Sequence, residues 1–328
     1  MISYRVLKQS LVATLWAGLL MTSSSFAATP EPGTLKMGVE PWLGYGQWHV
    51  ANHYGMFKKH GLEQVDVINF AEDKDINAAL ASGQIDAANI ATHTAMGMIA
   101  AGLPVKVVLL LDQSQTADAM LTGSGITDLK ELKGKSVAYE EGTTSDILLH
   151  SALSSAGMTL KDIKPVPMPA SSAGSALIAK RVDVAVTYEP YLSAARKNDA
   201  SVQMLYSGKN DPGLISDVLV VRDDVLKNRP GQVAALIATW DEALNHYNSN
   251  TQTDRAIIAK EVGASPEDLN SAFDGVKYYT LAENKQVLSN QFSKETFQHV
   301  LKAATEAGII TGTVTPAQVI DARFVNGE

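Results

Sequence analysis

Two histidines one helical turn apart, His49 and His53, have the spacing that comes nearest to a metal site in this sequence. Zinc hydrolases that place two histidines on one helix also need a glutamate directly after the first histidine, where it activates water. Here Val50 follows His49, and the chain has no cysteine that could supply a thiolate ligand. We therefore expect one histidine to be buried, the other to be solvated, and no metal ion to be bound.

Three further motifs each lack a residue that their chemistry requires. Gly44-Tyr45-Gly46 begins like a dinucleotide-binding loop, but His49 stands where a third glycine would let the helix pack closely. Gly134-Lys135-Ser136 looks like the end of a phosphate loop, but Leu129 replaces its leading glycine. The segment Ser171–Gly174 lacks the first glycine of a nucleophile elbow. The sequence therefore predicts no cofactor and no catalytic residues.

The elements that must position any site alternate between strands and helices. Short apolar runs predict strands at 35–39, 65–70, 87–90, 105–111, 136–139, 164–168, 184–187 and 216–221. Helical periodicity predicts one helix from near Tyr45 to Gly61 and others at 76–82, 92–101, 144–156, 172–180, 233–247, 254–262, 266–273 and 294–307. This alternation is typical of α/β proteins with mostly parallel strands.

The order of elements repeats along the chain. The segment from Gly61-Leu62 to Ile85-Asp86-Ala87-Ala88 is followed by a similar one from Gly157-Met158 to Val182-Asp183-Val184-Ala185. Two copies of one βαβ arrangement predict two similar lobes. We expect the first lobe to comprise residues 28–113 and 217–328 and the second to comprise 114–216. Two crossings, near Asp112–Gly123 and Ser216–Val221, would connect the lobes.

The start of the chain is typical of an exported protein. Arg5 and Lys8 precede an apolar run from Leu11 to Met21, and a small-residue site follows at Ala27. The run is shorter than the stretch of about 20 apolar residues that spans a membrane. We therefore predict a cleavable signal peptide at residues 1–27 and a soluble protein in the periplasm.

The charge of the chain argues against a nucleic-acid partner. The formal net charge is −8, and removing the basic start of the signal peptide makes it more negative. An acidic surface repels phosphate backbones. The composition, 45% hydrophobic and 19% charged, is typical of a globular protein with a substantial core. We expect a monomer.

Several segments of the chain together carry a family resemblance. The narrower signals are Tyr188-Glu189-Pro190-Tyr191 and the strand Asp217–Arg222; Pro41-Trp42, Gly55-Met56-Phe57, Ala79–Ala88 and Ile126–Gly142 also contribute. These segments resemble the nitrate/sulfonate/taurine group of periplasmic solute-binding proteins. The resemblance implies an α/β fold like type II periplasmic binding proteins, with two lobes, a ligand cleft and two hinge crossings. It also implies a small-molecule ligand, an ABC permease with its ATPase as partners, and no enzymatic activity.

In such lobes the ligand lies at the carboxyl ends of the strands, where helices begin. The ligand-binding residues predicted there are Trp42, Tyr45, Trp48, Thr92, His93, Asp112, Ser114, Glu140, Gly142, Thr143, Glu189 and Asp217. Some of these residues also fit purely structural roles. Thr143 has the residue type of a helix cap, Trp42 that of a core residue, and Glu140 that of a solvated loop charge.

The predicted cleft contains many carboxylates, and its nearest basic candidate is Lys74. A zwitterion such as taurine, or an amine-bearing compound, fits this charge better than nitrate does. Glu189 is predicted to contact the ligand. Two alternatives remain open at this point: an exported enzyme that uses a pair among Glu140, Glu141, Glu189 and Asp217 as acid and base, and a ligand sensor on the same fold.

Overall fold

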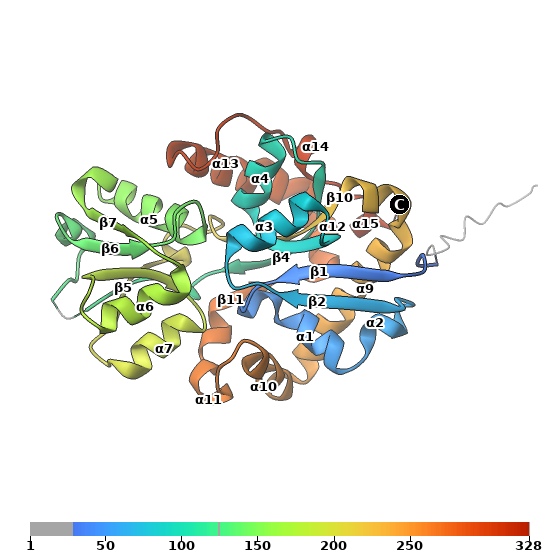
Figure 1. Cartoon of the computed structure of the whole chain (residues 1–328), viewed down its shortest axis with the longest axis horizontal. Helices are drawn as coiled ribbons and strands as arrows, with labels where there is room; N and C mark the ends of the chain where they lie inside the picture. The colour runs from blue at the N-terminus through green and yellow to red at the C-terminus, as the bar shows by residue number, and fades with distance from the viewer. Residues whose placement is uncertain (1–28, 124, 328) are drawn as a thin grey trace, which may run out of the picture.

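The computed structural model describes residues 29–123 and 125–327, which form two β-sheets with helices around them. Each sheet is the centre of one lobe, and the lobes lie side by side along the longest axis of the molecule (Figure 1). The predicted signal peptide, residues 1–27, lies outside the described residues. No helix within the described ranges is long and apolar enough to cross a membrane.

The first sheet is built from two separate parts of the chain. Its strands are β1 (Thr34–Val39), β2 (Gln64–Asn69), β3 (Ala87–Ala91), β4 (Val105–Ser114), β10 (Ser216–Arg222) and β11 (Val276–Tyr278). They lie in the order β11-β4-β10-β3-β1-β2. β1 is parallel to β2 and β3, whereas β10 is antiparallel to both β3 and β4. β10 thus returns to this sheet after the chain has built the second lobe.

The second sheet has the same core arrangement. Its strands are β5 (Asp118–Thr122), β6 (Ser136–Tyr139), β7 (Lys164–Pro167), β8 (Val184–Tyr188) and β9 (Gln203–Ser207). They lie in the order β7-β6-β8-β5-β9, with β6 parallel to β7 and β8. β5 is antiparallel to β8 and β9, and so takes the place that β10 has in the first sheet.

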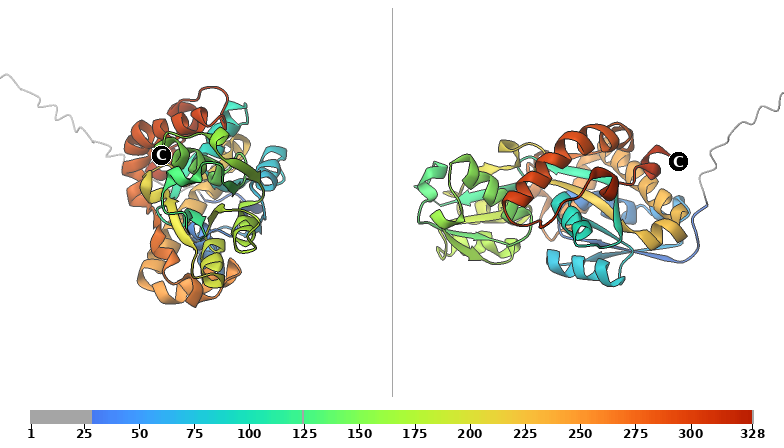
Figure 2. Two further views of the ribbon diagram at one scale, coloured as in Figure 1. Left: turned by 90° about the vertical axis from the view of Figure 1, so that its left-hand side faces the viewer. Right: turned by 90° about the horizontal axis from the view of Figure 1, so that it is seen from above.

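Helices and short helical turns cover both sheets (Figures 1 and 2). Those that precede the first crossing are η1 (Leu43–Tyr45), α1 (Gly46–His53), α2 (Met56–Lys59), α3 (Asp73–Ser82) and α4 (Thr92–Ala100). The second lobe has η2 (Leu129–Leu132), α5 (Thr144–Ser155), η3 (Leu160–Asp162), α6 (Ala170–Ile178), α7 (Tyr191–Asn198) and η4 (Gly208–Asn210). After β10 come α8 (Asp223–Asn228), α9 (Pro230–Ser249), α10 (Thr251–Glu261), α11 (Pro266–Leu269), η5 (Ala272–Gly275), α12 (Leu281–Gln286), η6 (Val287–Thr296), α13 (Phe297–Glu306), α14 (Pro316–Val319) and α15 (Arg323–Asn326).

The predicted fold class, two α/β lobes of the type II kind, is confirmed, but several elements differ from the prediction. The helix expected from Tyr45 to Gly61 is interrupted, because Gly55 adopts a left-handed conformation with φ 68° and starts α2. The apolar pattern predicts none of β5, β9 and β11. The helix expected at 266–273 is only the short α11 followed by η5, and the one expected from Lys294 begins as the π-helical segment η6.

The internal repeat has a structural basis in two aspartates that stand just before β3 and β8. Asp86 Oδ2 accepts a hydrogen bond from Lys36 N at 2.9 Å, and Asp183 Oδ2 accepts one from Ser136 N at 2.8 Å. Each aspartate also donates its own N–H to the carbonyl of that same partner. The first lobe therefore holds β1 to β3 in the same way as the second lobe holds β6 to β8.

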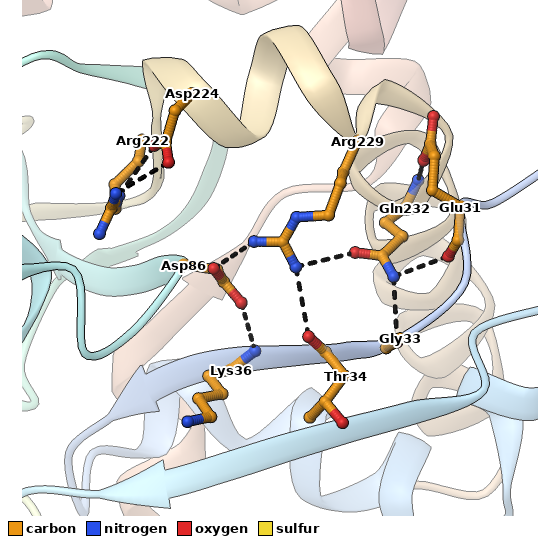
Figure 3. A network of polar contacts seen from close by, with 9 residues as sticks. All are labelled: Glu31, Gly33, Thr34, Lys36, Asp86, Arg222, Asp224, Arg229 and Gln232. Carbon is orange, nitrogen blue, oxygen red and sulfur yellow. Dashed lines mark hydrogen bonds and ion pairs between the residues drawn. The ribbon is translucent and has the colours of Figure 1, made fainter.

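In the first lobe this junction extends to the returning part of the chain (Figure 3). Asp86 forms an ion pair with Arg229, which precedes α9 and also donates to Thr34 O at 3.2 Å. Glu31 accepts hydrogen bonds from the first turn of α9, including Gln232 N at 2.9 Å. A carboxylate at a helix N-terminus is favoured by the helix dipole. The start of the described chain and α9 thus stabilise each other.

Two crossings connect the lobes, at residues 115–117 between β4 and β5 and at residues 211–215 between η4 and β10. Ser114 N, at the first crossing, donates a hydrogen bond to Ile215 O, at the second, over 3.1 Å. Gly208 packs on the carbonyl of Ser114 so closely that a Cβ there would lie 2.4 Å from the oxygen. The crossings therefore lie side by side.

A third connection between the lobes involves the C-terminal helices. α13 packs against α5, and Figure 2 shows α13 (red) reaching toward the second lobe (green). His299 Nε2 on α13 lies 2.7 Å from Asp211 Oδ1. Ser151 on α5 donates a hydrogen bond to Asp211 Oδ2 at 2.5 Å. Asp211 belongs to the second crossing, so these three side chains tie α13 of the first lobe and α5 of the second lobe to that crossing.

Candidate ligand cleft between the lobes

A pocket lies between the two lobes, with about 520 Å³ that atoms do not fill, part of it open to solvent. Residues that follow the parallel strands of both sheets contribute to it, as do the first residues of β5 and β10. Its position at a junction between lobes and at strand ends is typical of ligand sites in α/β proteins. It is lined by Glu40, Trp42, Tyr45, Ala71, Glu72, Asp73, Ala91, Asp118, Glu140, Thr143, Thr144, Ser145, Ala170, Tyr188 and Asp217.

Four of the lining carboxylates occupy equivalent positions in the two lobes. Glu40 directly follows β1, and Glu140 directly follows β6, the corresponding strand of the second lobe. Asp217 and Asp118 begin or nearly begin β10 and β5, where they pair with the last residue of β3 and of β8. The repeated fold therefore brings one glutamate and one aspartate from each lobe to the same pocket.

The two glutamates have different neighbours. Glu140 Oε2 accepts a hydrogen bond from Ala170 N at 2.8 Å, at the start of α6, which lowers the pKa that burial raises. Glu40 instead lies beside Asp73, in the first turn of α3, and its Oε1 is enclosed without a hydrogen-bond partner. Burial and the charge of Asp73 raise the pKa of Glu40 well above its ordinary value, and burial raises the pKa of Asp73 to about 7.

The end of the pocket near the crossings holds a second group of carboxyls. Burial, together with the charge of Asp217, raises the pKa of Asp118 to about 8. Burial raises the pKa of Asp217 to about 6. Asp112 is fully buried beside Asp217, and its pKa is raised by burial and by the charge of that neighbour. Carboxyls placed this close cannot all ionise without a compensating positive charge.

Aromatic side chains form the walls of the pocket. The rings of Trp42, from the first lobe, and Tyr188, from the second, pack edge to face with centroids 6.1 Å apart. Trp42 Nε1 donates to Asp112 Oδ2 at 3.3 Å across Gly44. A Cβ at Gly44 would lie 2.0 Å from that oxygen and 2.1 Å from Trp42 Nε1. The glycine of the apparent dinucleotide motif is therefore needed for this close approach.

Among the described residues that line the pocket, none is a lysine, an arginine or a histidine. Lys74 lies at the outer edge, where it forms an ion pair with Glu72. His93 is buried near Gly142 and Thr143, and burial lowers its pKa to about 4, so the imidazole is neutral at pH 7. The pocket thus presents carboxylates, hydroxyls and aromatic faces to a ligand.

Five of the predicted ligand-binding residues line the pocket: Trp42, Tyr45, Glu140, Thr143 and Asp217. Thr143 Oγ1 also caps α5 by accepting a hydrogen bond from Ser145 N at 3.3 Å. These five residues come from both lobes and lie around one pocket, and their contact with a ligand stays a prediction.

Other predicted residues surround the pocket without lining it. Asp112 lies behind Trp42, and His93 is buried at the start of α4. Thr92 Oγ1 donates to Ser216 O at 2.9 Å, and Ser114 Oγ accepts from Asp118 N at 2.9 Å, so both stabilise the chain near the crossings. Gly142, with φ 79°, lines a groove outside the pocket.

Trp48 and Glu189 do not line the pocket, although the charge of Glu189 acts on the pocket residue Asp118. Trp48 is fully buried in the first lobe, where its Nε1 donates to Asn89 Oδ1 at 2.8 Å and its ring lies 4.9 Å from that of Trp240. Glu189 accepts hydrogen bonds from Ser193 N at 2.9 Å and Ser193 Oγ at 2.8 Å, in the first turn of α7. Both side chains already have internal partners.

Sequence reasoning did not select Glu40, Asp73, Asp118 or Tyr188, all of which line the pocket. A signal for Glu40 exists in the repeat, because it holds the position in the first lobe that Glu140 holds in the second. Asp118 lies inside the segment predicted as the first crossing. Asp73 carries no signal beyond its place at a helix start.

The chain is similar in sequence to proteins that are named as binding proteins. The chain is 26% identical over 236 residues to a protein of Brucella abortus (strain 2308) that is provisionally named a binding protein, covering 71% of this chain and 73% of the relative. It is 26% identical over 269 residues to a protein of Escherichia coli (strain K12) that is provisionally named an aliphatic sulfonates-binding protein, covering 81% and 83%.

A solved structure shows the same fold. The periplasmic aliphatic sulphonate binding protein SsuA from Escherichia coli superimposes with a TM-score of 0.74 at 22% sequence identity, covering 89% of this chain and 92% of that one. The relatives named here are binding proteins, which confirms the expectation of a binder rather than an enzyme. The model of the family described as NMT1/THI5 like matches residues 46–252, so the chain belongs to the NMT1/THI5-like family.

Proposed function

We propose that this chain is the periplasmic binding component of an ABC importer and that it captures a small organic cation, such as an amine, in the pocket between its lobes. The observation that carries the proposal is the charge of the pocket lining. Six lining residues are acidic, and none of the described lining residues is basic.

The physical argument is the free energy of the carboxyls in the empty pocket. Burial raises the pKa values of Asp73, Asp118 and Asp217, and the charges of neighbouring carboxylates raise those of Asp73 and Asp118 further, so ionising all three is unfavourable without a counter-charge. A bound ammonium group supplies that charge and donates hydrogen bonds to several carboxylates at once. The faces of Trp42 and Tyr188 favour the same kind of ligand through cation–π attraction.

A second candidate is a zwitterion such as taurine, with an amine at the carboxylates and a sulfonate at the start of α5. Thr143, Thr144 and Ser145 line the pocket there, and the start of a helix favours an anion. The sulfonate ligands named for relatives and structural neighbours favour this candidate as well. A simple sulfonate without an amine does not fit, because nothing would offset the nearby carboxylates.

We propose further that the lobes close on the ligand by bending at the two crossings, with residues 28–113 and 217–328 moving against residues 114–216. Because carboxylates of both lobes line the pocket, one ligand contacts both lobes and favours the closed state. An ABC permease and its ATPase would then receive the ligand from the closed protein. Small-angle scattering should show a smaller radius of gyration at saturating ligand, and an unchanged radius would contradict closure.

A thermal-shift panel with one carbon chain and different end groups tests the ligand class. We expect an alkylamine to raise the melting temperature, the alkanesulfonate of equal length to leave it unchanged, and the aminoalkanesulfonate to distinguish the two candidates. Ligand at about 100 times its Kd stabilises a protein by about 2.7 kcal/mol, which is readily measured. Stabilisation by the alkanesulfonate, without stabilisation by any amine, would refute the proposal.

A further inference from the structure

The carboxylates of the pocket form two groups, and each group contains residues from both lobes. The hinge-end group consists of Asp118 and Asp217, which lie at the starts of the two strands that leave the crossings. The outer group consists of Glu40, Asp73 and Glu140, which follow β1, β2 and β6. The arrangement of these groups gives more information about the ligand than their total charge does.

The hinge-end group lies at the inner end of the pocket. The carboxyls of Asp118 and Asp217 interact with each other, and Tyr45 donates a hydrogen bond to Asp217. Behind them Asp112 is 0% exposed, and its Oδ1 has no hydrogen-bond partner within the described chain. Three carboxyls, those of Asp112, Asp118 and Asp217, therefore lie together at the inner end of the pocket, and none of the described lining residues supplies a positive charge there.

The outer group lies where the pocket opens. Asp73, Glu140 and Thr143 line both the pocket and a groove on the outside of the molecule. Glu40 interacts with Asp73 and Glu140, and its Oε1 is enclosed without a partner. The first lobe and the second lobe thus face each other here through carboxylates as well.

Aromatic surface joins the two groups. Trp42 donates to Asp112 at the hinge end, and its ring packs on Tyr188. Tyr188 is the ladder partner of Asp118, and the charge of Glu40 acts on its phenol. The wall between the groups therefore suits an apolar or planar linker, with hydrogen-bonding partners at its two ends.

We propose that the ligand carries two positively charged groups, one held between Asp118 and Asp217 and the other between Glu40, Asp73 and Glu140. This inference rests on the proposed function and narrows its ligand class to dications of the diamine type. Each charge bridges both lobes, so both ends of the ligand favour closure. A ligand with a single charge would leave one group of carboxylates without a counter-ion inside the pocket, apart from Lys74 at the outer edge, whose charge acts on Glu140.

The test compares linear α,ω-diaminoalkanes of increasing length with the 1-aminoalkanes of equal length, by calorimetry at fixed pH and ionic strength. We expect one diamine to bind at least about tenfold more tightly than its matched monoamine. Asp118→Asn and Glu40→Gln should each remove most of that preference. Glu189→Gln is the matched control: it neutralises a buried carboxylate that does not line the pocket, and it should keep the preference.

The outcomes separate this inference from the proposed function. Diamines and monoamines of equal affinity would overturn the inference and leave the function of cation capture intact. A preference for diamines that survives both Asp118→Asn and Glu40→Gln would also overturn it, provided that circular dichroism shows folded variants. Absence of binding by every diamine would overturn it too. Binding of alkanesulfonates in place of all amines would overturn both the inference and the proposed function.

Discussion

Glu40 and Glu140 occupy the same place in two copies of one fold, yet their surroundings differ. Glu140 accepts the N–H of Ala170 at the start of α6, whereas Glu40 lies beside another carboxyl, that of Asp73. The repeated fold therefore determines where a side chain lies, and the neighbouring residues determine its charge state. The carboxylate of the second lobe has a backbone N–H as its partner, whereas that of the first lobe has only another carboxyl, that of Asp73, and its Oε1 has no hydrogen-bond partner. We expect the positive charge of the ligand to stabilise the carboxylates of the first lobe more than those of the second.

The largest effect should come from comparing Glu40→Gln with Glu140→Gln. A charge-assisted hydrogen bond contributes about 1.5–3 kcal/mol, so losing Glu40 should weaken cation binding by about ten- to a hundredfold. Glu40→Gln should also raise the melting temperature of the empty protein, because it removes carboxylate repulsion. Glu140→Gln should weaken binding less and should not raise the melting temperature. Calorimetry and thermal unfolding give both readouts; equal melting-temperature changes would contradict the comparison.

The two lobes also differ in how they contribute to the aromatic wall. The first lobe supplies Trp42, whose position depends on the absence of a side chain at Gly44. Gly44→Ala should destabilise the protein by about 1–3 kcal/mol, because its Cβ would overlap Asp112 and Trp42. It should also weaken ligand binding by displacing Trp42. Gly97→Ala is the control: the new Cβ meets only Ile310, at 3.7 Å, within a helix. Denaturant unfolding measures the stability of both variants. A Gly44→Ala protein as stable as the wild-type protein would contradict the close approach at Gly44.

The pH dependence of stability tests the hinge-end carboxyls. Asp118 keeps its proton up to a pKa of about 8 in the folded protein, whereas an unfolded aspartate releases it near pH 4. The folded state binds more protons in this window, so the free energy of unfolding should fall as the pH rises, by about 1 kcal/mol per pH unit between pH 6 and 8. Asp217, Glu189 and Asp73 face Asp118 and contribute to this shift.

Asp118→Asn should flatten this dependence of the empty protein, as measured by denaturant unfolding at several pH values. The affinity for a cation should change with pH in the opposite direction to the free energy of unfolding, because a cation favours ionised carboxylates. Affinity for an amine should therefore rise from pH 6 to pH 8. A free energy of unfolding that rises over this range in the wild-type protein, or an unaltered slope in Asp118→Asn, would argue against a protonated Asp118.

The smallest effect is expected from Glu189→Gln. Glu189 caps α7 through Ser193, so its loss should reduce stability by about 1 kcal/mol and leave affinity unchanged. The equivalent change at Glu140 alters affinity, because Glu140 caps α6 and also lines the pocket. A loss of affinity in Glu189→Gln comparable to that of Glu140→Gln would return Glu189 to the ligand site.

The fold is predicted well because its signals are local: apolar runs mark the strands, and glycines mark the ends of helices. The repeat around Asp86 and Asp183 also predicts two lobes, since these residues tie equivalent strands together. The site is predicted only in part. Trp48 and Glu189 have the residue types and spacing of ligand contacts, but their partners, Asn89 and Ser193, depend on side-chain direction, which spacing does not fix.

The residues that the prediction misses lie in the pocket between the two lobes. Asp118 joins the pocket because β5 pairs with β8, a contact between segments far apart in sequence. Asp73 becomes important only because Glu40 lies beside it. Neither pairing leaves a mark on local periodicity. An alignment of the two halves of the chain would have identified Glu40 from Glu140, but it would not have identified their different neighbours.

The contact between His299 and Asp211 connects ligand affinity to residues outside the pocket. It ties α13 of the first lobe to the second crossing, and Asp211 also accepts from Ser151 of the second lobe, so its free energy enters the equilibrium between open and closed protein, and the apparent Kd depends on the closed fraction. An exposed ion pair contributes about 0.2–1 kcal/mol, which is about a 1.4- to fivefold change in that fraction. His299→Gln, measured by calorimetry, should thus shift affinity without altering selectivity among ligands. Sequence change in α13 could therefore tune capture to the scarcity of the solute while the binding chemistry stays fixed.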